Sequence, residues 1–351
     1  MGLFDRIKKL LGERRERRSE REVNGRTGDL NHRSPSGFED DLPLPEDIDE
    51  SIAVLKTTRR LSLFEREVVG WFRRGDIPYQ LGEGFVVVPE GELEDLQFGL
   101  GNLAQLCALH EEAKWPSIIQ QHFDGIVKSM RAHRRDGDAV RALHTVRDKL
   151  AVRLWEVSDL PEKTAAEMLS REDIPGLVTV LCVDYPDSIA TVRRDEAAGW
   201  GLTENELFEI AITNSMRLAE PVAAVHDVGE GDTLVMYSGE SFFVSSTILR
   251  FAELGDGEGI GEHGAFIAVP TRNVVIALPF TGIGSLQALG KLMQITTGMH
   301  HDGPGPVTRR VYWWHDGVWD EVTYEVAEGR LNVKPSDALV EKMNGLAEEG
   351  Q

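Results

Sequence analysis

The chain has 351 residues, with 38 basic and 59 acidic side chains and a formal net charge of −21. This length suffices for two domains, and the excess of negative charge excludes general nucleic-acid binding, because phosphate backbones require a basic surface. No apolar run approaches the roughly 20 residues that a membrane-spanning helix needs. Lys8 and Lys9 interrupt the apolar residues near the start, so we expect no secretory signal and a cytoplasmic protein.

The first eighteen residues predict a short basic amphipathic helix. Its apolar side chains and the lysines between them are Leu3, Phe4, Ile7, Lys8, Lys9, Leu10 and Leu11. Such a helix is marginal alone in water, and an anionic membrane surface or a groove on a partner protein would stabilise it. We expect residues 1–18 to dock the chain peripherally at the inner face of the membrane or on a partner. The alternative is a solubilising tail.

Residues 19–50 predict a linker without folded structure. Turn-forming pairs such as Asn24-Gly25 and Ser34-Pro35 occupy its first half. Seven acidic side chains and no basic one follow between residues 39 and 50. A segment of this composition cannot bury enough apolar surface to fold.

Residues 51–155 predict a mostly helical first domain. Apolar residues at helical spacing indicate helices at 62–74 and 96–109, a third that starts near Pro116, and a last one that ends at 155. A single short strand is expected at 84–89, where proline stops it. Cys107 and Cys182, the only cysteines, lie in apolar segments and are expected to be buried thiols.

Residues 156–345 predict a second domain with a mixed sheet. The expected strands are 177–183, 189–192, 222–227, 233–237, 241–244, 265–269, 273–279, 309–315 and 318–324. Helices are expected after Thr203, at 284–297 and at 336–347. Because the strands cluster rather than alternate with helices, the pattern favours an α+β fold.

The helix after Thr203 has the best-defined start in the chain. Thr203 and Glu206 have the spacing of a capping box. Asn214 falls on the apolar face of the same helix, where an amide must be hydrogen-bonded. We expect it to bind a neighbouring backbone segment and to have a structural role.

One candidate binding surface is the hairpin around Asp316-Gly317, a pair that favours a two-residue type I′ turn. This turn places Trp314 opposite Trp319, and Tyr312 then shares their face. If exposed, this aromatic face would serve as a platform for a protein or a ligand. The alternative is a core face covered by a helix.

A second candidate is Arg272, a single basic residue at a predicted turn in an acidic domain. Its guanidinium group could bind a carboxylate or a phosphate through two hydrogen bonds. The alternative is a structural ion pair with one of the many acidic residues. His300, His301 and Asp302 are weak candidates for a metal site, because adjacent side chains rarely converge on one ion. We expect no metal and no cofactor.

The second domain resembles the bacterial YtpQ-like family of uncharacterised proteins over roughly residues 174–345. An order of features carries the resemblance, and it comprises Asp184-Tyr185-Pro186, Gly201-Leu202-Thr203, Glu206-Leu207, Ser245-Ser246 and Val269-Pro270-Thr271-Arg272. Asn273 fits the family pattern loosely. The resemblance implies an α+β bacterial cytoplasmic protein and implies no activity.

These patterns together favour a non-enzymatic binding or regulatory protein with an unknown protein partner. No Ser/His/Asp arrangement or nucleophile elbow is present around Ser241, Ser245 or Ser246. One alternative is a hydrolase that uses the polar loops around Arg272 and His300. The other is the acidic member of a toxin–immunity or secretion system, which would cover a basic partner through charge complementarity.

Overall fold

The computed structural model describes residues 52–349 except 83, 92–96, 136–141, 161, 186–187, 230–231 and 328–329. The predicted docking helix (1–18) and acidic linker (19–50) therefore lie outside the described residues. The chain divides into two compact units between Asp124 and Gly125. Both contain helices and antiparallel sheets, which confirms the predicted α+β class.

The first unit combines helices with one small sheet. Its elements are η1 (Ala53–Leu55), α2 (Thr58–Arg74), β1 (Gln80–Gly82), β2 (Phe85–Val87), β3 (Gln97–Gly99), α3 (Gly101–Ala108), η2 (Glu112–Lys114) and α4 (Trp115–Arg135), which runs past the end of the unit. The strand order is β1-β2-β3, and both pairs are antiparallel. The sequence pattern missed β1 and β3, because three residues are too few for a visible alternation.

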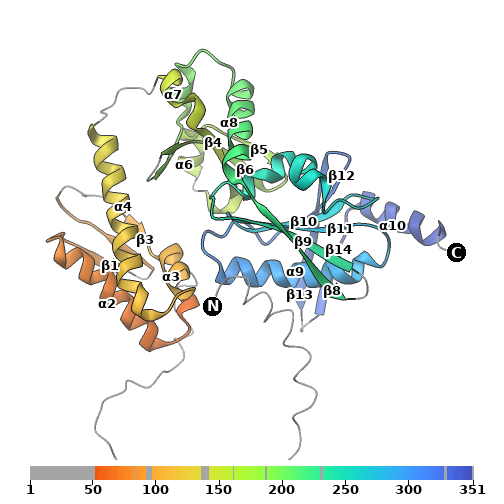
Figure 1. Ribbon diagram of the computed structural model, residues 1–351, viewed down its shortest axis with the longest axis horizontal. Helices are drawn as coiled ribbons and strands as arrows, with labels where there is room; N and C mark the ends of the chain where they lie inside the picture. The colour runs from red at the N-terminus through yellow and green to blue at the C-terminus, as the bar shows by residue number, and fades with distance from the viewer. Residues whose placement is uncertain are drawn as a thin grey trace, which may run out of the picture. The chain divides into compact units, whose positions relative to one another are not determined.

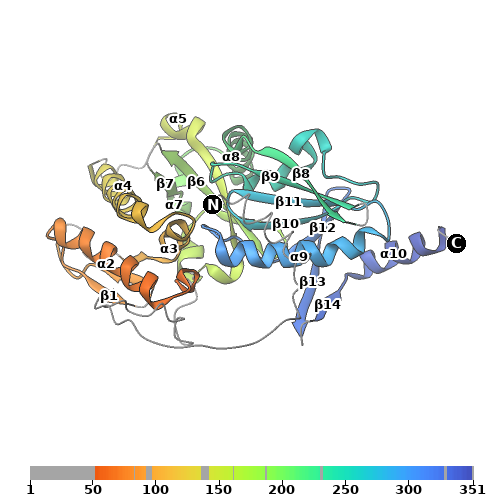
Figure 2. The ribbon, with the colours of Figure 1, turned by 60° about the horizontal axis from the view of Figure 1, so that its bottom comes forward.

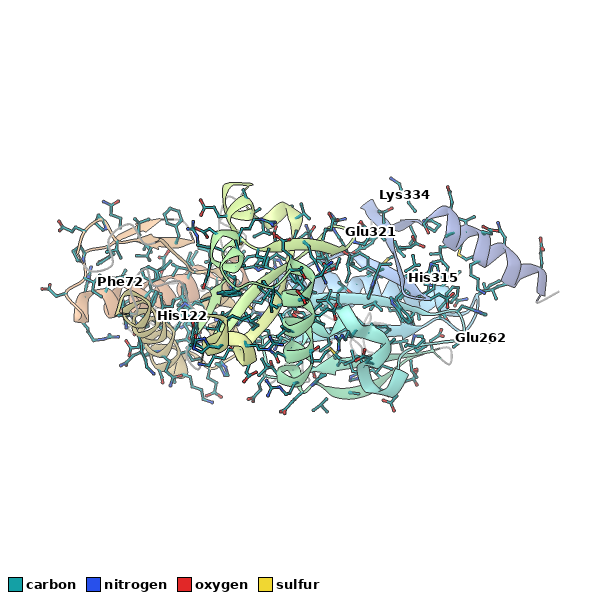
Figure 3. All side chains as sticks on the ribbon, turned by 90° about the horizontal axis from the view of Figure 1, so that it is seen from above. Phe72, His122, Glu262, His315, Glu321 and Lys334 are labelled. Carbon is teal, nitrogen blue, oxygen red and sulfur yellow. The ribbon has the colours of Figure 1, made fainter. Side chains whose placement is uncertain are left out.

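Aromatic rings form the core of the first unit. Phe72 on α2 (Figure 3) contacts Phe98 on β3 and Phe123 on α4, with ring centroids 5.8 and 5.2 Å apart. Trp71 stacks on Phe123 at 4.8 Å, and its indole N–H donates to Asp124 Oδ1 (2.8 Å). Because Trp71 keeps a polar partner, its ring is buried without an unpaired donor.

The second unit contains two sheets and the helices around them. Its elements are α5 (Leu143–Val146), η3 (Arg147–Lys149), β4 (Leu150–Glu156), η4 (Val157–Asp159), α6 (Glu162–Glu167), β5 (Ser170–Ile174), β6 (Leu177–Tyr185), β7 (Ser188–Thr191), α7 (Arg194–Ala198), α8 (Glu204–Ala219), β8 (Val222–Gly229), β9 (Asp232–Ser238), η5 (Ser245–Gly257), β10 (Ala265–Thr271), β11 (Val274–Pro279), α9 (Ser285–Asp302), β12 (Val311–His315), β13 (Val318–Ala327), β14 (Arg330–Lys334) and α10 (Asp337–Glu349). No helix among the described residues is long and apolar enough to cross a membrane.

The larger sheet has seven strands in the order β14-β13-β12-β10-β11-β9-β8, all antiparallel. Helix α9 lies along one face, over β10 and β11 (Figures 1 and 2). The other face packs against η5 through Ile248, Phe251 and Leu254. Since both faces are covered, every residue of β10 is buried, as a central strand requires.

The smaller sheet places β6 between β4 and β5, and β7 also pairs with β6. Helix α8 packs on β4 and contributes Leu207, Phe208 and Ala211 to a second core. The Ser215 hydroxyl of this helix accepts a hydrogen bond from the Val152 N–H of β4 (2.9 Å). This hydrogen bond therefore fixes the backbone of β4 against α8.

Strand β4 departs from the predicted organisation. Residues that end at 155 were expected to form a helix, but Leu150–Glu156 pair along their whole length with β6. Apolar side chains on both faces of this segment obscure its period, and pairing with a buried strand decides its conformation. The expected boundary between residues 155 and 156 thus falls at the end of a strand that pairs within the second unit.

Three further differences concern short segments. Residues 241–244 were expected to form a strand, but they form a turn that leads into η5. Phe243 and Val244 are buried there, so their apolar character reflects packing rather than sheet pairing. Strands β5 and β14 were not predicted, because both are polar segments at sheet edges.

Two local predictions are confirmed. Thr203 and Glu206 form the capping box of α8, in which the Thr203 N–H donates to Glu206 Oε2 (2.8 Å). Asp316 and Gly317 both have positive φ, at 48° and 80°, as a type I′ turn requires. The turn sets the expected register, with Trp314 opposite Trp319.

Candidate functional site

Arg272 lies in the turn between β10 and β11. Its backbone N–H donates to the carbonyl oxygen of Gly305 (2.8 Å), and its carbonyl oxygen accepts from the N–H of Ser245 (2.9 Å). Within the turn, the Thr271 hydroxyl donates to Asn273 Oδ1 (3.0 Å). Segments from two other parts of the unit therefore hold the backbone of this turn.

The side chain of Arg272 is held between a glycine and an aromatic ring. A methyl group added to Gly305 would come within 2.6 Å of Arg272 Cδ, and Gly305 has a φ of +68°, so both space and backbone favour glycine here. The guanidinium carbon of Arg272 lies 3.9 Å from the ring centroid of Phe242. Phe242 is 44% exposed, which places the guanidinium group near the surface of the unit. Contact through the ring face leaves the in-plane N–H groups available.

No carboxylate neutralises Arg272 among the residues that the structure describes. Burial, and then the positive charge of Arg153, lower the pKa of Arg272 to about 10. Across the same residues, its guanidinium group takes part in no hydrogen bond or ion pair; its contact is with the Phe242 ring. The expected alternative of a structural ion pair is therefore not found. In a chain with 59 acidic residues, this arginine is a place where an anion from outside could bind.

Arg153 on β4 is the second arginine of the site. Its guanidinium carbon lies 5.1 Å from the ring centroid of Trp155, and burial lowers its pKa. It too lacks a hydrogen bond or an ion pair within the described part of the chain. A half-buried guanidinium group loses part of its hydration, and the charge of an anionic ligand would compensate for that loss. We call Arg153 and Arg272, with the rings of Trp155 and Phe242, the arginine pair site.

Two consecutive serines connect the segments that carry these arginines. The Ser245 N–H binds the carbonyl oxygen of Arg272, and the Ser246 hydroxyl donates to the carbonyl oxygen of Val152 (2.7 Å), the residue before Arg153. Both serines are buried. Their hydrogen bonds fix the turn and β4 to the same end of η5, and the hydroxyl of Ser246 is engaged in that structural role.

The aromatic hairpin face is a core surface and not an exposed platform. Tyr312 is fully buried, and its hydroxyl donates to the carbonyl oxygen of Pro175 (2.9 Å). Trp314 and Trp319 are half-buried, and both contact the ring of Phe251 on η5. The 3-10 helix η5 therefore covers this face, as the alternative of a core face predicted, and Tyr312, Trp314 and Trp319 are corrected from binding candidates to core residues.

The histidines proposed as weak metal ligands do not form a loop site. His300, His301 and Asp302 form the last turn of α9, where successive side chains point about 100° apart. No group of three His, Cys, Asp or Glu residues suited to a metal occurs in the described part of the chain. Burial and the nearby charge of Arg309 lower the pKa of His300. Among the described residues, no hydrogen bond or ion pair joins His300 to Arg272.

Two other clusters of polar side chains in the unit are internally paired. Arg310 donates to Glu156 and to both carboxylate oxygens of Glu321 (Figure 3), at 3.2 and 2.6 Å. His315 Nε2 lies 3.1 Å from Asp320 Oδ2 across the hairpin (Figure 3). These side chains satisfy each other, which contrasts with the arginine pair site.

Sequence reasoning identified Arg272 but missed Arg153 and Phe242. Arg153 was placed in an expected helix, and Phe242 in an expected strand. The signal that was available is the alternation of Arg153 and Trp155 on one face of a short strand. Only tertiary structure brings β4 to the turn of β10 and β11.

Comparison with known proteins found no matching family model, no matching curated protein and no matching solved structure. The resemblance of residues 174–345 to the YtpQ-like family therefore stays a prediction.

Proposed function

We propose that the chain is a non-enzymatic binding or regulatory protein whose second unit holds an anionic group of its partner at Arg272. The observation that carries this proposal is the guanidinium group of Arg272, which rests on the exposed ring of Phe242 without a carboxylate partner among the described residues. An anionic group would supply the charge-assisted hydrogen bonds that this arginine lacks.

The surroundings of Arg272 favour binding over catalysis. The hydroxyl groups of Ser246 and Thr247 are buried and donate to the carbonyl oxygens of Val152 and Val244. Within the described residues, neither hydroxyl is hydrogen-bonded to a histidine or a carboxylate, as an activated nucleophile would be. A hydrolase that forms a covalent intermediate on Ser246 or Thr247 would require such a pair.

The binding function is tested by anion-dependent stabilisation of the full chain, since a ligand that binds the folded state raises its stability. Sodium phosphate, sulfate and acetate are compared with sodium chloride at equal ionic strength, and the midpoint of thermal unfolding is measured. We expect at least one of these anions to raise the midpoint of the natural chain and Arg272→Gln to abolish the increase. If none of them acts differently from chloride, the proposal is wrong.

We further propose that residues 1–18, which lie outside the described residues, dock the protein on an anionic membrane surface. Leu3, Phe4 and Leu10 provide the apolar face, and Lys8 and Lys9 provide the charge. Basic residues near an anionic surface each contribute about 1 kcal/mol to binding, a substantial term against a net charge of −21.

Flotation with phosphatidylserine vesicles tests this docking. We expect the full chain to float, and a chain that starts at Glu39 to stay in solution. A full-length variant with Lys8→Gln and Lys9→Gln should float only weakly, and high salt should abolish the flotation that remains. Equal flotation of all three proteins would contradict the docking proposal. It would not affect the proposal that Arg272 binds an anion.

A further inference from the structure

We propose that the arginine pair site binds a phosphate group, which bridges the guanidinium groups of Arg153 and Arg272. This inference rests on the proposed binding function and specifies its ligand.

Two consecutive residues of η5 hold the backbones that carry the two arginines. Ser245 binds the backbone of Arg272 and Ser246 binds the residue before Arg153, through hydrogen bonds of 2.9 and 2.7 Å. Adjacent residues of η5 thus determine the separation between the two backbones that carry the site. Burial is the main cause of the lowered pKa of Arg272, and the positive charge of Arg153 adds to it.

Both guanidinium groups contact an aromatic ring. The guanidinium carbon of Arg153 lies 5.1 Å from the ring centroid of Trp155, and that of Arg272 lies 3.9 Å from the ring centroid of Phe242. A ring contact restricts a guanidinium group and provides none of the acceptor oxygens that its N–H groups bind. Two guanidinium groups with N–H donors to spare suit a ligand with several acceptor oxygens in a tetrahedral arrangement.

The charge of the two arginines favours a phosphate over a carboxylate as the ligand. Two cations without a carboxylate partner in the described part of the chain present a local charge of about +2. A carboxylate group would neutralise one of them, whereas a phosphate monoester carries about −1.5 to −2 charges at pH 7 and three acceptor oxygens. Because half-buried cations lose hydration, the ligand that neutralises both is favoured over the ligand that neutralises one.

Arg250 and Arg310 of the same unit differ from the arginine pair site. Arg250 on η5 donates to Glu209 (3.0 Å), and Arg310 donates to Glu156 and Glu321. Both have protein carboxylates as partners and therefore need no ligand. Arg250 also lies on the same element as Ser245 and Ser246, which makes it a matched control.

The test measures the binding of inorganic phosphate, sulfate and acetate to the full chain by titration calorimetry. Phosphate and sulfate should bind more tightly than acetate by about tenfold, which corresponds to about 1.4 kcal/mol. Arg272→Gln and Arg153→Met should each weaken phosphate binding by at least about tenfold, since each removes one charged partner. Arg250→Gln should leave it unchanged.

Two conservative variants keep the test valid if Arg153→Met fails to fold. Arg153→Lys and Arg272→Lys retain the charge but lose the planar N–H edge. Both should bind phosphate more weakly than the natural chain and more tightly than Arg272→Gln. Phosphate affinity that is unchanged in all variants of Arg153 would overturn the bridging arrangement.

The outcomes separate this inference from the proposed function. If acetate binds as tightly as phosphate and depends on Arg272 alone, the phosphate inference fails and the binding function stands. If no anion binds, both fail. Flotation with phosphatidic acid vesicles, compared with phosphatidylserine vesicles, identifies the source of the phosphate: a selective loss with Arg272→Gln indicates a lipid headgroup, and no loss indicates a soluble phosphate compound.

Discussion

At the scale of single residues, Asn214 and Arg272 show which hydrogen bonds can be predicted from the sequence and which cannot. Asn214 behaves as predicted, because its amide group donates to the carbonyl oxygens of Arg147 and Leu150. Arg272 was predicted to bind an anion or to form an ion pair, and the described residues provide it with no ion pair. A sequence shows which residues are charged. The distance from an arginine to the nearest acidic side chain depends on how strands that are far apart in the sequence pack together.

The role of Asn214 can be measured directly. Asn214→Ala leaves two carbonyl groups without the amide that they bind, at 3.0 and 2.9 Å. We expect it to lower the free energy of unfolding by about 1–3 kcal/mol, the cost of losing such partners. Urea unfolding followed by circular dichroism gives this value.

Asn205 provides the matched control on the same helix. It is exposed, and its side chain accepts one hydrogen bond from Arg171 at the surface. Asn205→Ala should change the free energy of unfolding by less than about 0.5 kcal/mol. Equal losses for both variants would show that Asn214 has no special structural role.

The capping box predicts a pH dependence with a definite sign. Hydrogen bonds from the backbone N–H and the hydroxyl of Thr203 lower the pKa of Glu206. A carboxyl group with a lowered pKa in the folded state stabilises the fold above its unfolded pKa, about 4.3 for glutamate. This stabilisation is lost as the pH falls through the lower folded-state pKa.

The variant Glu206→Gln isolates this contribution, because glutamine retains an acceptor oxygen and lacks the charge. The natural chain should be more stable than the variant at pH 7, and the difference should shrink as the pH falls below about 4.3. Chemical unfolding over a pH series checks this. A difference that stays constant between neutral and acidic pH would contradict the assigned pKa shift.

At the scale of elements, the sequence predicts best where turns and caps are strong. Thr203 defines the start of α8, and Asp316-Gly317 defines both the hairpin and its register. Strand β4 was mistaken for a helix because its residues are apolar on both faces, and β14 was missed because its residues are mostly polar. The local sequence therefore specifies where helices and hairpins begin and end. Whether an ambiguous segment becomes a helix or a strand is decided by its pairing with other strands.

The hairpin turn predicts a cost for any side chain at Gly317. Its φ of +80° lies in the region that residues with a Cβ atom adopt at a cost of roughly 1–2 kcal/mol. Gly317→Ala should therefore lower the free energy of unfolding by about that amount, although a methyl group there meets no atom within 4 Å. Thermal and urea unfolding measure the change.

Gly298 provides a control of opposite sign. It lies inside α9, and a methyl group there also meets nothing within 4 Å. Gly298→Ala should raise the free energy of unfolding by about 0.5–1 kcal/mol, because alanine favours the helix. If Gly317→Ala also stabilises the protein, the left-handed turn does not form.

At the scale of the whole molecule, the distribution of charge links the two proposals. The chain carries a net charge of −21, yet its first eighteen residues are basic and its second unit contains the arginine pair site. The basic segment was evident from the sequence. The arginine pair was not, because Arg153 and Arg272 are far apart along the chain and only the packing of β4 against η5 brings their backbones to consecutive serines.

The central claim is that Arg153 and Arg272 together hold one anion. A crystal structure of the full chain grown with tungstate, a tetrahedral anion with strong anomalous scattering, tests it most directly. The account predicts an anomalous peak within hydrogen-bonding distance of both guanidinium groups, and its disappearance in Arg272→Gln. Guanidinium groups that are both paired with carboxylates of the chain itself, with no peak between them, would contradict the account.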